Sequence, residues 1–333
     1  MTIVYVSNTR FPTEKAHGIA LAKLCEAFAD EGAEVHVVVP RVRNAIKDDP
    51  YSFYGVQKNF SVTYLPTVDV YLFGLFKPVF FAVQLFSFSI AAFFYCRRYE
   101  GKRAIFFSHD YIPLCFLTFL PNHIIYDIHH FPGNNFLYRR VMKKAALFPV
   151  QTKWKVEELS KQFGIPKERI PYWPNGVDAE HFEVKETTKE AKRALKLSPE
   201  PLALYIGQLF PWKGADTFVR SIAHVRSNVR YAIVGGEEAD RVRIRKNIPE
   251  SNDPRISFYP FQPRKRIPLW LKAADVLVLP NTGTMKVSLY YTSPMKLFEY
   301  MAAGKPIVSS DIPSVREIVS EQEVFFATPD DPL

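Results

Sequence analysis

The sequence predicts an α/β protein of two doubly wound domains. Two series of short apolar strands alternate with helical patterns, and a polar stretch separates the series. The length of 333 residues is about twice the usual size of a single domain. Apolar residues make up 47% of the chain and charged residues 23%, a balance typical of globular proteins. We therefore expect two domains, each with its own core.

The first series begins with a strand, a helix and a second strand. Strands are expected at residues 3–6, 35–39, 62–65, 104–107 and 123–126. An amphipathic run at residues 19–30 follows the first strand and ends at Gly32. This order is a βαβ unit, so residues 1–180 are assigned to the first domain.

The second series shows the same alternation. Strands are expected at residues 203–206, 231–234, 256–258, 276–279 and 306–309, with helices from Ala215, Arg241, Ile267 and Pro294. The strands are mostly continuous apolar runs, as in a buried parallel sheet. A polar stretch at residues 175–200 precedes them, so residues 200–333 are assigned to the second domain.

Cysteine content and charge restrict the function classes. Cys25, Cys96 and Cys115 lack the paired spacing of a disulfide framework or a zinc site. No signal-peptide pattern precedes the first strand, so a cytoplasmic chain that starts at Met1 is expected. The net charge of +9 favours an anionic partner, either nucleic acid, anionic lipid or a phosphorylated small molecule. No nucleic-acid-binding motif accompanies this charge, so we expect no nucleic-acid partner.

Residues 70–103 form an unusual aromatic segment that carries eight phenylalanines before Arg97 and Arg98. Its longest charge-free run, residues 79–96, is shorter than the roughly 20 residues that span a bilayer. Two alternatives stay open: a helix buried against the first sheet, and a helix at a membrane surface. In the second, Gln84, Ser87 and Ala91 would form a narrow polar stripe opposite a broad aromatic face.

Ligands of doubly wound sheets bind beyond the carboxyl ends of the strands. In the first domain, the loop at residues 7–18 lacks the glycines of a dinucleotide fingerprint, which argues against a dehydrogenase. Gly18 opens a helix, where free N–H groups favour an anion. Residues just after two strands offer a polar wall suited to a sugar: His109, Asp110, Asp127, His129 and His130. His17 is assigned to the acceptor side with Asp127, His129 and His130. Each histidine could equally be a satisfied core residue, and the spacing fits no zinc site.

In the second domain, two strand ends and a helix start suit a diphosphate. Gly207 ends a strand and Lys213 stands just before a helix, where a cation joins the free N–H groups. Gly235 follows the next strand and would let a ligand approach the backbone closely.

Residues 293–306 contain the clearest helix pattern of the chain. Ser293 suits the N-cap and Pro294 the first helical position. Lys296 and Glu299 lie three residues apart and so share a face of this helix. Glu299 could accept hydrogen bonds from ribose hydroxyls, or the two could be a surface ion pair.

Together these residues resemble the family 4 retaining glycosyltransferases of the GT-B fold, in the subgroup with SP-x-K before the motif. The resemblance rests on the order of EKAHG, SHD, PNGVD, YIGQLFPWKG, IVGG and SPMKLFEYMAAGKPIV along the chain. It implies two Rossmann-like domains facing each other across a cleft, with the donor held mainly by the second. It also implies sugar transfer from a nucleoside diphosphate sugar to an acceptor hydroxyl with retention, without a metal or other cofactor.

The resemblance assigns roles at individual positions. Gly18 would approach the donor diphosphate, Lys213 would be the diphosphate cation, and Glu299 the ribose ligand. His109 would lie near the transferred sugar and Phe261 near the base.

The sequence departs from the family pattern at two of its positions. Tyr291 stands where the first glutamate of E-x7-E belongs, and Gln208 stands where an arginine commonly follows the glycine. Lys296 is near enough to substitute for that second cation.

Two matters stay open at this point. The family usually continues beyond residues 325–332 with further helices, so either this chain is truncated or that segment is absent. The alternatives to a transferase are a GT-B sugar epimerase and a non-catalytic nucleotide- or lipid-binding scaffold. For a transferase, the aromatic segment favours a glycan or lipid-linked acceptor in polysaccharide or glycolipid assembly, with the enzyme peripheral on the inner membrane face.

Overall fold

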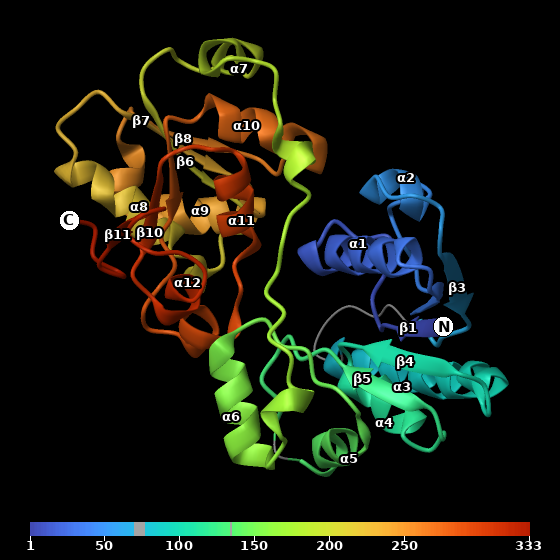
Figure 1. Ribbon diagram of the computed structural model, residues 1–333. Coiled ribbons are helices and arrows are strands. Elements are labelled where there is room, and N and C mark those ends of the chain that lie inside the picture. Colours follow the sequence, from blue (N-terminus) through green and yellow to red (C-terminus); the bar gives the residue numbers. More distant parts are fainter. Residues whose placement is uncertain (70–76, 134) are drawn as a thin grey trace. The chain divides into compact units, whose positions relative to one another are not determined.

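The computed structural model describes residues 1–69, 77–133 and 135–333. The chain divides into two compact units (Figure 1). Unit 1 comprises Met1–Val150 and Val156–Tyr172, and unit 2 comprises Gln151–Lys155 and Trp173–Leu333. Each unit contains its own sheet, flanked by helices.

The sheet of unit 1 is parallel throughout, with strand order β3-β2-β1-β4-β5. Its strands are β1 (Thr2–Val6), β2 (Glu34–Pro40), β3 (Ser61–Leu65), β4 (Ala104–Ser108) and β5 (His123–Tyr126). All five were predicted within one residue at either end. Because the strands are parallel, the loops that follow β1, β4 and β5 leave the same edge of the sheet.

Helices cover both faces of this sheet. They are α1 (Ala16–Asp30), α2 (Pro50–Tyr54), α3 (Lys77–Cys96), α4 (Tyr111–Leu117), α5 (Phe136–Lys144) and α6 (Lys153–Phe163). The first three residues of α6 belong to unit 2. Tyr5 of β1 packs in one core with Leu21 of α1, while the adjacent Val4 packs in another with Phe88 of α3. The alternation of side chains along a strand thus supplies two cores, as in a doubly wound domain.

The sheet of unit 2 is also parallel, with strand order β11-β10-β9-β6-β7-β8. Its strands are β6 (Leu202–Ile206), β7 (Arg230–Val234), β8 (Ile256–Tyr259), β9 (Val276–Leu279), β10 (Ile307–Ser310) and β11 (Phe325–Ala327). The five predicted strands are confirmed, and the three-residue β11 adds an edge strand that was not predicted.

The helices of unit 2 pack in the same way. They are α7 (Thr188–Ala194), α8 (Ala215–Arg220), α9 (Glu238–Asn247), α10 (Ile267–Ala273), α11 (Met295–Ala302) and α12 (Pro313–Arg316). Leu204 of β6 shares a core with α10 and α11, and the adjacent Tyr205 shares one with α8 and α9. The prediction of two doubly wound α/β domains is therefore confirmed.

Helix α3 combines features of both alternatives left open for the aromatic segment. Phe88, Ala92 and Cys96 are fully buried, on the side that faces the core of unit 1. On the opposite side lies a stripe of apolar residues with 44–63% of their surface exposed: Val79, Val83, Phe86, Ile90 and Phe94. By length and composition alone, Pro78–Tyr99 would suffice to cross a membrane. Residues 70–76 of the predicted segment lie outside the described residues.

Candidate functional site

Three of the predicted histidines come together at the carboxyl edge of the unit 1 sheet. The ring of His109, just after β4, lies 5.4 Å from that of His129 and 6.4 Å from that of His17, measured between centroids. His17 comes from the first turn of α1, and His129 from the loop after β5. Strand ends and a helix start that are distant in sequence thus form one cluster.

A closed hydrogen-bond network holds the ring of His109. Its Nδ1 lies 3.1 Å from the Tyr5 hydroxyl and its Nε2 lies 3.3 Å from Ser7 Oγ. Asp110 Oδ2 accepts hydrogen bonds from Ser7 Oγ at 3.2 Å and from the backbone N–H of Asn8 at 2.7 Å. The network fixes the imidazole in one orientation. Sequence analysis did not single out Tyr5, Ser7 or Asn8, because their role depends on contacts more than a hundred residues apart.

Burial lowers the pKa values of two imidazoles in this cluster, His17 and His109. Desolvation lowers the pKa of His17 to about 4, and the nearby His109 adds to the effect. Desolvation also lowers the pKa of His109, against the opposing charge of Asp110. These imidazoles are therefore uncharged near neutral pH, where each can donate one hydrogen bond and accept another.

The remaining acceptor-side residues differ in their environment. Asp127 is buried, and its Oδ2 lies 2.8 Å from His129 Nε2. His130 is exposed at the surface of the same loop. Asp127 and His129 belong to the cluster by contact, whereas His130 lies at its margin.

Gly18 has a packing requirement of its own. A Cβ at Gly18 would lie 2.4 Å from the Tyr54 hydroxyl and 2.5 Å from Cγ2 of Thr13. That hydroxyl is held by the backbone of Thr13, whose N–H donates to it at 2.6 Å and whose carbonyl accepts from it at 3.0 Å. The close approach of Tyr54 thus requires glycine here, independently of any ligand.

In unit 2, Lys296 of α11 is buried against an aromatic ring. Its Nζ lies 3.7 Å from the centroid of Tyr205. Among the residues that the structure describes, this Nζ has no hydrogen-bond partner. Desolvation lowers the pKa of Lys296 well below its usual value, the charge of Lys213 lowers it further, and Glu299 acts in the opposite direction. An ammonium ion in such a place is short of an anionic partner.

Lys213 repeats this arrangement. Its Nζ lies 3.8 Å from the centroid of the Trp212 ring, and burial lowers its pKa to about 8. Within the described parts of the chain, the structure gives this Nζ neither a hydrogen bond nor an ion pair. Two lysines close enough to repel each other therefore lie on separate aromatic rings. Sequence analysis named both lysines but neither ring.

Glycines make room for this lysine pair. Gly207 has φ +141°, and a Cβ there would lie 3.1 Å from Nζ of Lys296. Gly235 has φ +113°, and a Cβ there would lie 2.4 Å from the carbonyl oxygen of Gly207. Side chains at these positions would therefore crowd the strand ends.

The prediction that Ser293 caps α11 is wrong. The helix begins at Met295, and Pro294 precedes it in an extended conformation with ψ 107°. Ser293 is buried, and its hydroxyl accepts a hydrogen bond from the backbone N–H of Asn175 at 3.1 Å. The Asn175 side chain donates to the Ser293 carbonyl at 2.6 Å. Ser293 fails as a cap because its hydroxyl and carbonyl hold the chain of the PNGVD motif.

Glu299 lies on the same helix as Lys296, as predicted. Burial raises the pKa of Glu299, while the charges of Arg264 and Lys296 act to lower it. Arg264 was not predicted as a site residue; it stands in the loop after β8. Phe261, in that same loop, is 53% exposed.

The two departures from the family pattern are accounted for locally. Tyr291 packs its ring 5.3 Å from that of Trp154, both in unit 2. Gln208 is exposed, and its carbonyl accepts a hydrogen bond from the Tyr205 hydroxyl at 2.5 Å. A different side chain could therefore stand at Gln208 without loss of a contact. The backbone carbonyl of Gln208 holds the Tyr205 ring, on which Lys296 lies.

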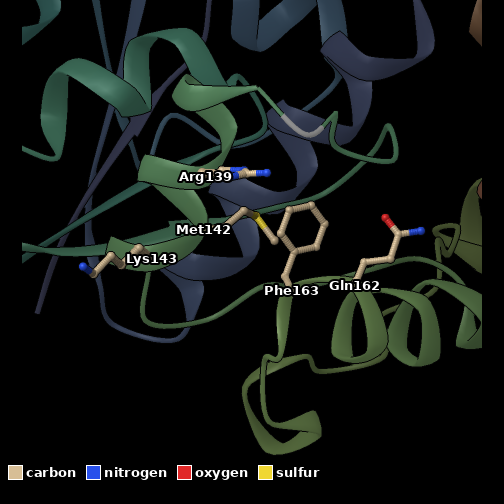
Figure 2. Close-up of a pocket in the computed structure, with 5 residues that line it drawn as sticks. All are labelled: Arg139, Met142, Lys143, Gln162 and Phe163. Carbon is tan, nitrogen blue, oxygen red and sulfur yellow. The ribbon is translucent and has the colours of Figure 1, made fainter.

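A separate pocket lies in unit 1, away from all predicted site residues. It has a cavity volume of about 370 Å³ (Figure 2). Arg139, Met142 and Lys143 of α5 line it together with Gln162 and Phe163 at the end of α6. Figure 2 shows the Phe163 ring beside Met142, with the Lys143 side chain directed away from the ring. The pocket contains none of the histidines and neither lysine of the candidate site.

Each half of the chain matches a known family. Residues 18–181 match the family described as Glycosyltransferase Family 4, and residues 200–333 match Glycosyl transferases group 1. The chain joins a glycosyltransferase family 4 domain to a group 1 domain. Unit 1 contains nearly all of the family 4 domain, and the group 1 domain lies within unit 2.

Curated relatives match part of the chain at low identity. D-inositol 3-phosphate glycosyltransferase of Xylanimonas cellulosilytica is 26% identical over 178 residues, which cover 50% of this chain and 41% of the relative. Putative teichuronic acid biosynthesis glycosyltransferase TuaH of Bacillus subtilis is 23% identical over 209 residues, 58% of this chain and 47% of the relative. Each match thus spans less than half of the relative's length.

Solved structures match the whole chain in fold. Sucrose-phosphate synthase from Thermosynechococcus elongatus superposes with a TM-score of 0.76 at 18% identity, covering 99% of this chain and 86% of that one. HepE of Anabaena in complex with UDP-glucose gives a TM-score of 0.73 at 16% identity, covering 100% and 86%. With two parallel-sheet domains, the family 4 and group 1 domains form a GT-B fold, as predicted.

Proposed function

We propose that the protein is a retaining glycosyltransferase. It would move a sugar from a nucleoside diphosphate sugar to an acceptor hydroxyl of a glycan or lipid-linked molecule. The observation that carries the proposal is the pair of lysines in the group 1 domain. Both lie on aromatic rings, and within the described residues neither ammonium group has a hydrogen bond or ion pair to an anion. A diphosphate supplies the two negative charges that this pair lacks. The complex of HepE with UDP-glucose supports the donor class.

The lysine pair would act on the leaving group. As the bond between sugar and diphosphate breaks, negative charge grows on the diphosphate, and Lys213 and Lys296 would stabilise it there. Gly207 and Gly235 would let the phosphates approach the strand ends. With two cations in place, we assign the stabilisation of this charge to the protein itself and expect no metal ion.

The other donor contacts would surround this pair. Glu299 would accept hydrogen bonds from the ribose, helped by Arg264, whose charge favours the ionised carboxylate. Phe261 would lie near the base. Gly18 would contribute the first domain's contact with the diphosphate, and Ser293 would support the start of α11 through Asn175.

The histidine cluster would serve the sugar and the acceptor. Tyr5 and Ser7 occupy both ring nitrogens of His109. The backbone carbonyl of His109, or its ring after one of these hydrogen bonds is exchanged, would therefore contact the sugar without adding charge. His17, Asp127, His129 and the exposed His130 would line the acceptor side. In a front-face mechanism the departing phosphate accepts the proton of the acceptor hydroxyl, so a carboxylate nucleophile is not required.

Nucleotide binding tests the donor site. Titration calorimetry with UDP, GDP, ADP, dTDP and CMP compares the wild type with Glu299→Ala and with Glu186→Ala, a control at an exposed glutamate. The proposal predicts that one nucleoside diphosphate binds selectively, and that only Glu299→Ala weakens it. Absence of binding to any of the five would contradict the proposal.

A second candidate is a non-catalytic nucleotide-binding scaffold, favoured by Gln208 and Tyr291 in place of charged family residues. Both candidates bind a nucleoside diphosphate, so only turnover separates them. Slow hydrolysis of the matching nucleotide sugar without acceptor, lost in His109→Asn, would support the transferase. Tight binding with no turnover would support the scaffold.

The acceptor setting follows from the segment around α3. We infer that the enzyme works in polysaccharide or glycolipid assembly at the cytoplasmic face of a membrane, as a peripheral protein. The exposed apolar side of α3 supports this inference, since a lipid-linked acceptor brings its hydroxyl to a membrane surface.

A further inference from the structure

The family 4 domain exposes a continuous apolar surface on α3. Val79, Val83, Phe86, Ile90 and Phe94 recur every three or four residues and so share one side of the helix. We call these five residues the α3 face. The opposite side of α3, with Phe88 and Ala92, is already buried in the domain core. The α3 face is therefore not used in packing the domain core.

This surface extends beyond α3. The ring of Phe86 meets that of Phe116 edge-on, with centroids 6.3 Å apart. Three residues on, Phe119 is 67% exposed, and the guanidinium of Arg140 lies 3.9 Å from the centroid of its ring. Arg140 also donates from Nε to Thr118 Oγ1 at 2.6 Å. The apolar surface thus passes from α3 over the end of α4 to a cation on α5, helices that adjoin in this domain (Figure 1).

Cations follow the α3 face at its C-terminal end, where Arg97 also lies 3.9 Å from the carboxylate of Glu100. Residues 70–99 contain no aspartate or glutamate, and Arg97 and Arg98 follow the face directly. The guanidinium of Arg98 is stacked 3.7 Å from the centroid of Tyr95. Lys143 and Lys144 on α5 are exposed. This composition complements an anionic surface with an apolar interior.

The same charges argue against a second copy of the chain on this face. A symmetric dimer places the same patch of both copies together, so the cations at its rim would meet cations. An anionic bilayer instead gives the apolar stripe a nonpolar layer and the rim a negative surface potential. The observations therefore favour lipid as the occupant.

We propose that the α3 face docks the family 4 domain onto an anionic bilayer surface, with α3 lying in the plane of the interface. The inference rests on the proposed function and deepens it by naming the surface that brings the enzyme to a lipid-linked acceptor. Gln84 of α3 exchanges two hydrogen bonds with Asn8, at 2.8 and 3.3 Å. The backbone N–H of Asn8 in turn donates to Asp110, beside His109. The docking helix therefore adjoins the acceptor-side histidines.

Vesicle flotation tests the proposal with the full chain. The vesicles contain phosphatidylcholine alone, or phosphatidylcholine with an equal part of phosphatidylglycerol, at low and high salt. The variants are Phe86→Ser/Ile90→Ser/Phe94→Ser, which changes exposed side chains only, and Arg97→Glu/Arg98→Glu. Phe325→Ser and Lys189→Glu/Arg193→Glu are matched controls, at an exposed phenylalanine and at exposed cations of unit 2.

The wild type is expected to float with the anionic vesicles and to lose binding at high salt. The serine variant should lose at least about tenfold in vesicle affinity, and the glutamate variant about fivefold for each cation removed. Both controls should bind as the wild type does. Equal flotation of all variants would overturn the proposal.

Two further outcomes would also overturn it. A wild-type dimer in light scattering that the serine variant converts to a monomer, without vesicle binding, would assign the face to a second copy. Resistance of bound protein to alkaline carbonate would assign α3 to a membrane span. Nucleotide calorimetry on the same variants keeps the two proposals apart, because the α3 variants should retain the wild-type affinity for the nucleoside diphosphate.

Discussion

Both domains place polar side chains at the carboxyl edges of their sheets. The two sets of side chains differ in whether they are hydrogen-bonded within the protein. In the family 4 domain, His109 is bonded on both ring nitrogens, and Asp127 pairs with His129. In the group 1 domain, Lys296 and Lys213 face aromatic rings instead of acceptors. Within the described residues, the first set of side chains is hydrogen-bonded inside the protein, whereas the two ammonium groups of the second set have no hydrogen-bonded anion.

The two sites differ in the free energy that burial of their polar groups costs the fold. Buried polar groups that are hydrogen-bonded to one another cost less to bury than unpaired ones, so this network can hold a sugar-binding surface in a fixed shape. A buried ammonium without a partner destabilises the fold until a ligand neutralises it. The lysine pair is therefore where ligand binding should change stability most.

The largest effect should come from the loop that places Lys213. Gly214 has φ +69°, and a Cβ there would lie 1.5 Å from the carbonyl oxygen of Pro280. We expect Gly214→Ala to lower the free energy of unfolding by about 3 kcal/mol or more, because the backbone must shift as well as strain. Gly304 has φ +62° with open space around it, so Gly304→Ala should cost only about 1 kcal/mol. Denaturant unfolding of both variants measures the difference, and equal costs would contradict this account of the loop.

Removal of the first lysine should have the next largest effect. Lys213→Met keeps the contact with Trp212 but removes the charge, and the affinity for the preferred nucleoside diphosphate should fall about 100-fold. Lys246→Met, at an exposed lysine of the same domain, should leave the affinity unchanged. Calorimetry measures both.

The pH dependence of this binding has a defined sign. Lys213, with a pKa of about 8 in the free protein, must be protonated in the complex. Wild-type affinity should therefore fall as pH rises above about 8, by up to tenfold per pH unit. Affinity that stays constant in this range would place the lysine outside the phosphate site.

Replacement of Lys296 should change stability and nucleotide affinity in opposite directions. Lys296→Met removes a buried, unpaired ammonium, so the melting temperature should rise while diphosphate affinity falls about tenfold. Adding Gln208→Arg should restore much of the affinity, because it returns a cation to the usual family position. A variant that loses both stability and affinity would mean that Lys296 is a structural residue.

Changes in the histidine cluster should have the smallest effect. They should alter the pH dependence of stability and leave the affinity for the donor unchanged. The pKa of His17 is lowered to about 4 in the folded protein, so the unfolded chain binds this proton more readily. The stability it contributes is complete above about pH 6.5 and is lost as pH falls towards 4. His17→Gln should flatten this part of the profile of melting temperature against pH. His224→Gln, at an exposed histidine, should not.

Sequence analysis predicted the fold and named several residues that lie at the two sheet edges, but it did not predict their contacts. Continuous apolar strands predicted ten of the strands, whereas β11 was missed because it has three residues and an exposed Phe325. The local sequence pattern predicted Ser293 as a helix cap. Its hydroxyl instead accepts a hydrogen bond from the backbone N–H of Asn175, 118 residues away. The contact of Lys296 with Tyr205 joins residues ninety-one positions apart, so no local pattern could predict it.

The central claim is that Lys213 and Lys296 together recognise a diphosphate. The most direct test compares the affinity of the best-binding nucleoside diphosphate with that of its monophosphate, in the wild type and in Lys213→Met/Lys296→Met. The account predicts that the wild type prefers the diphosphate by about 100-fold or more and that the double variant binds both almost equally. An unchanged preference in the double variant would contradict it.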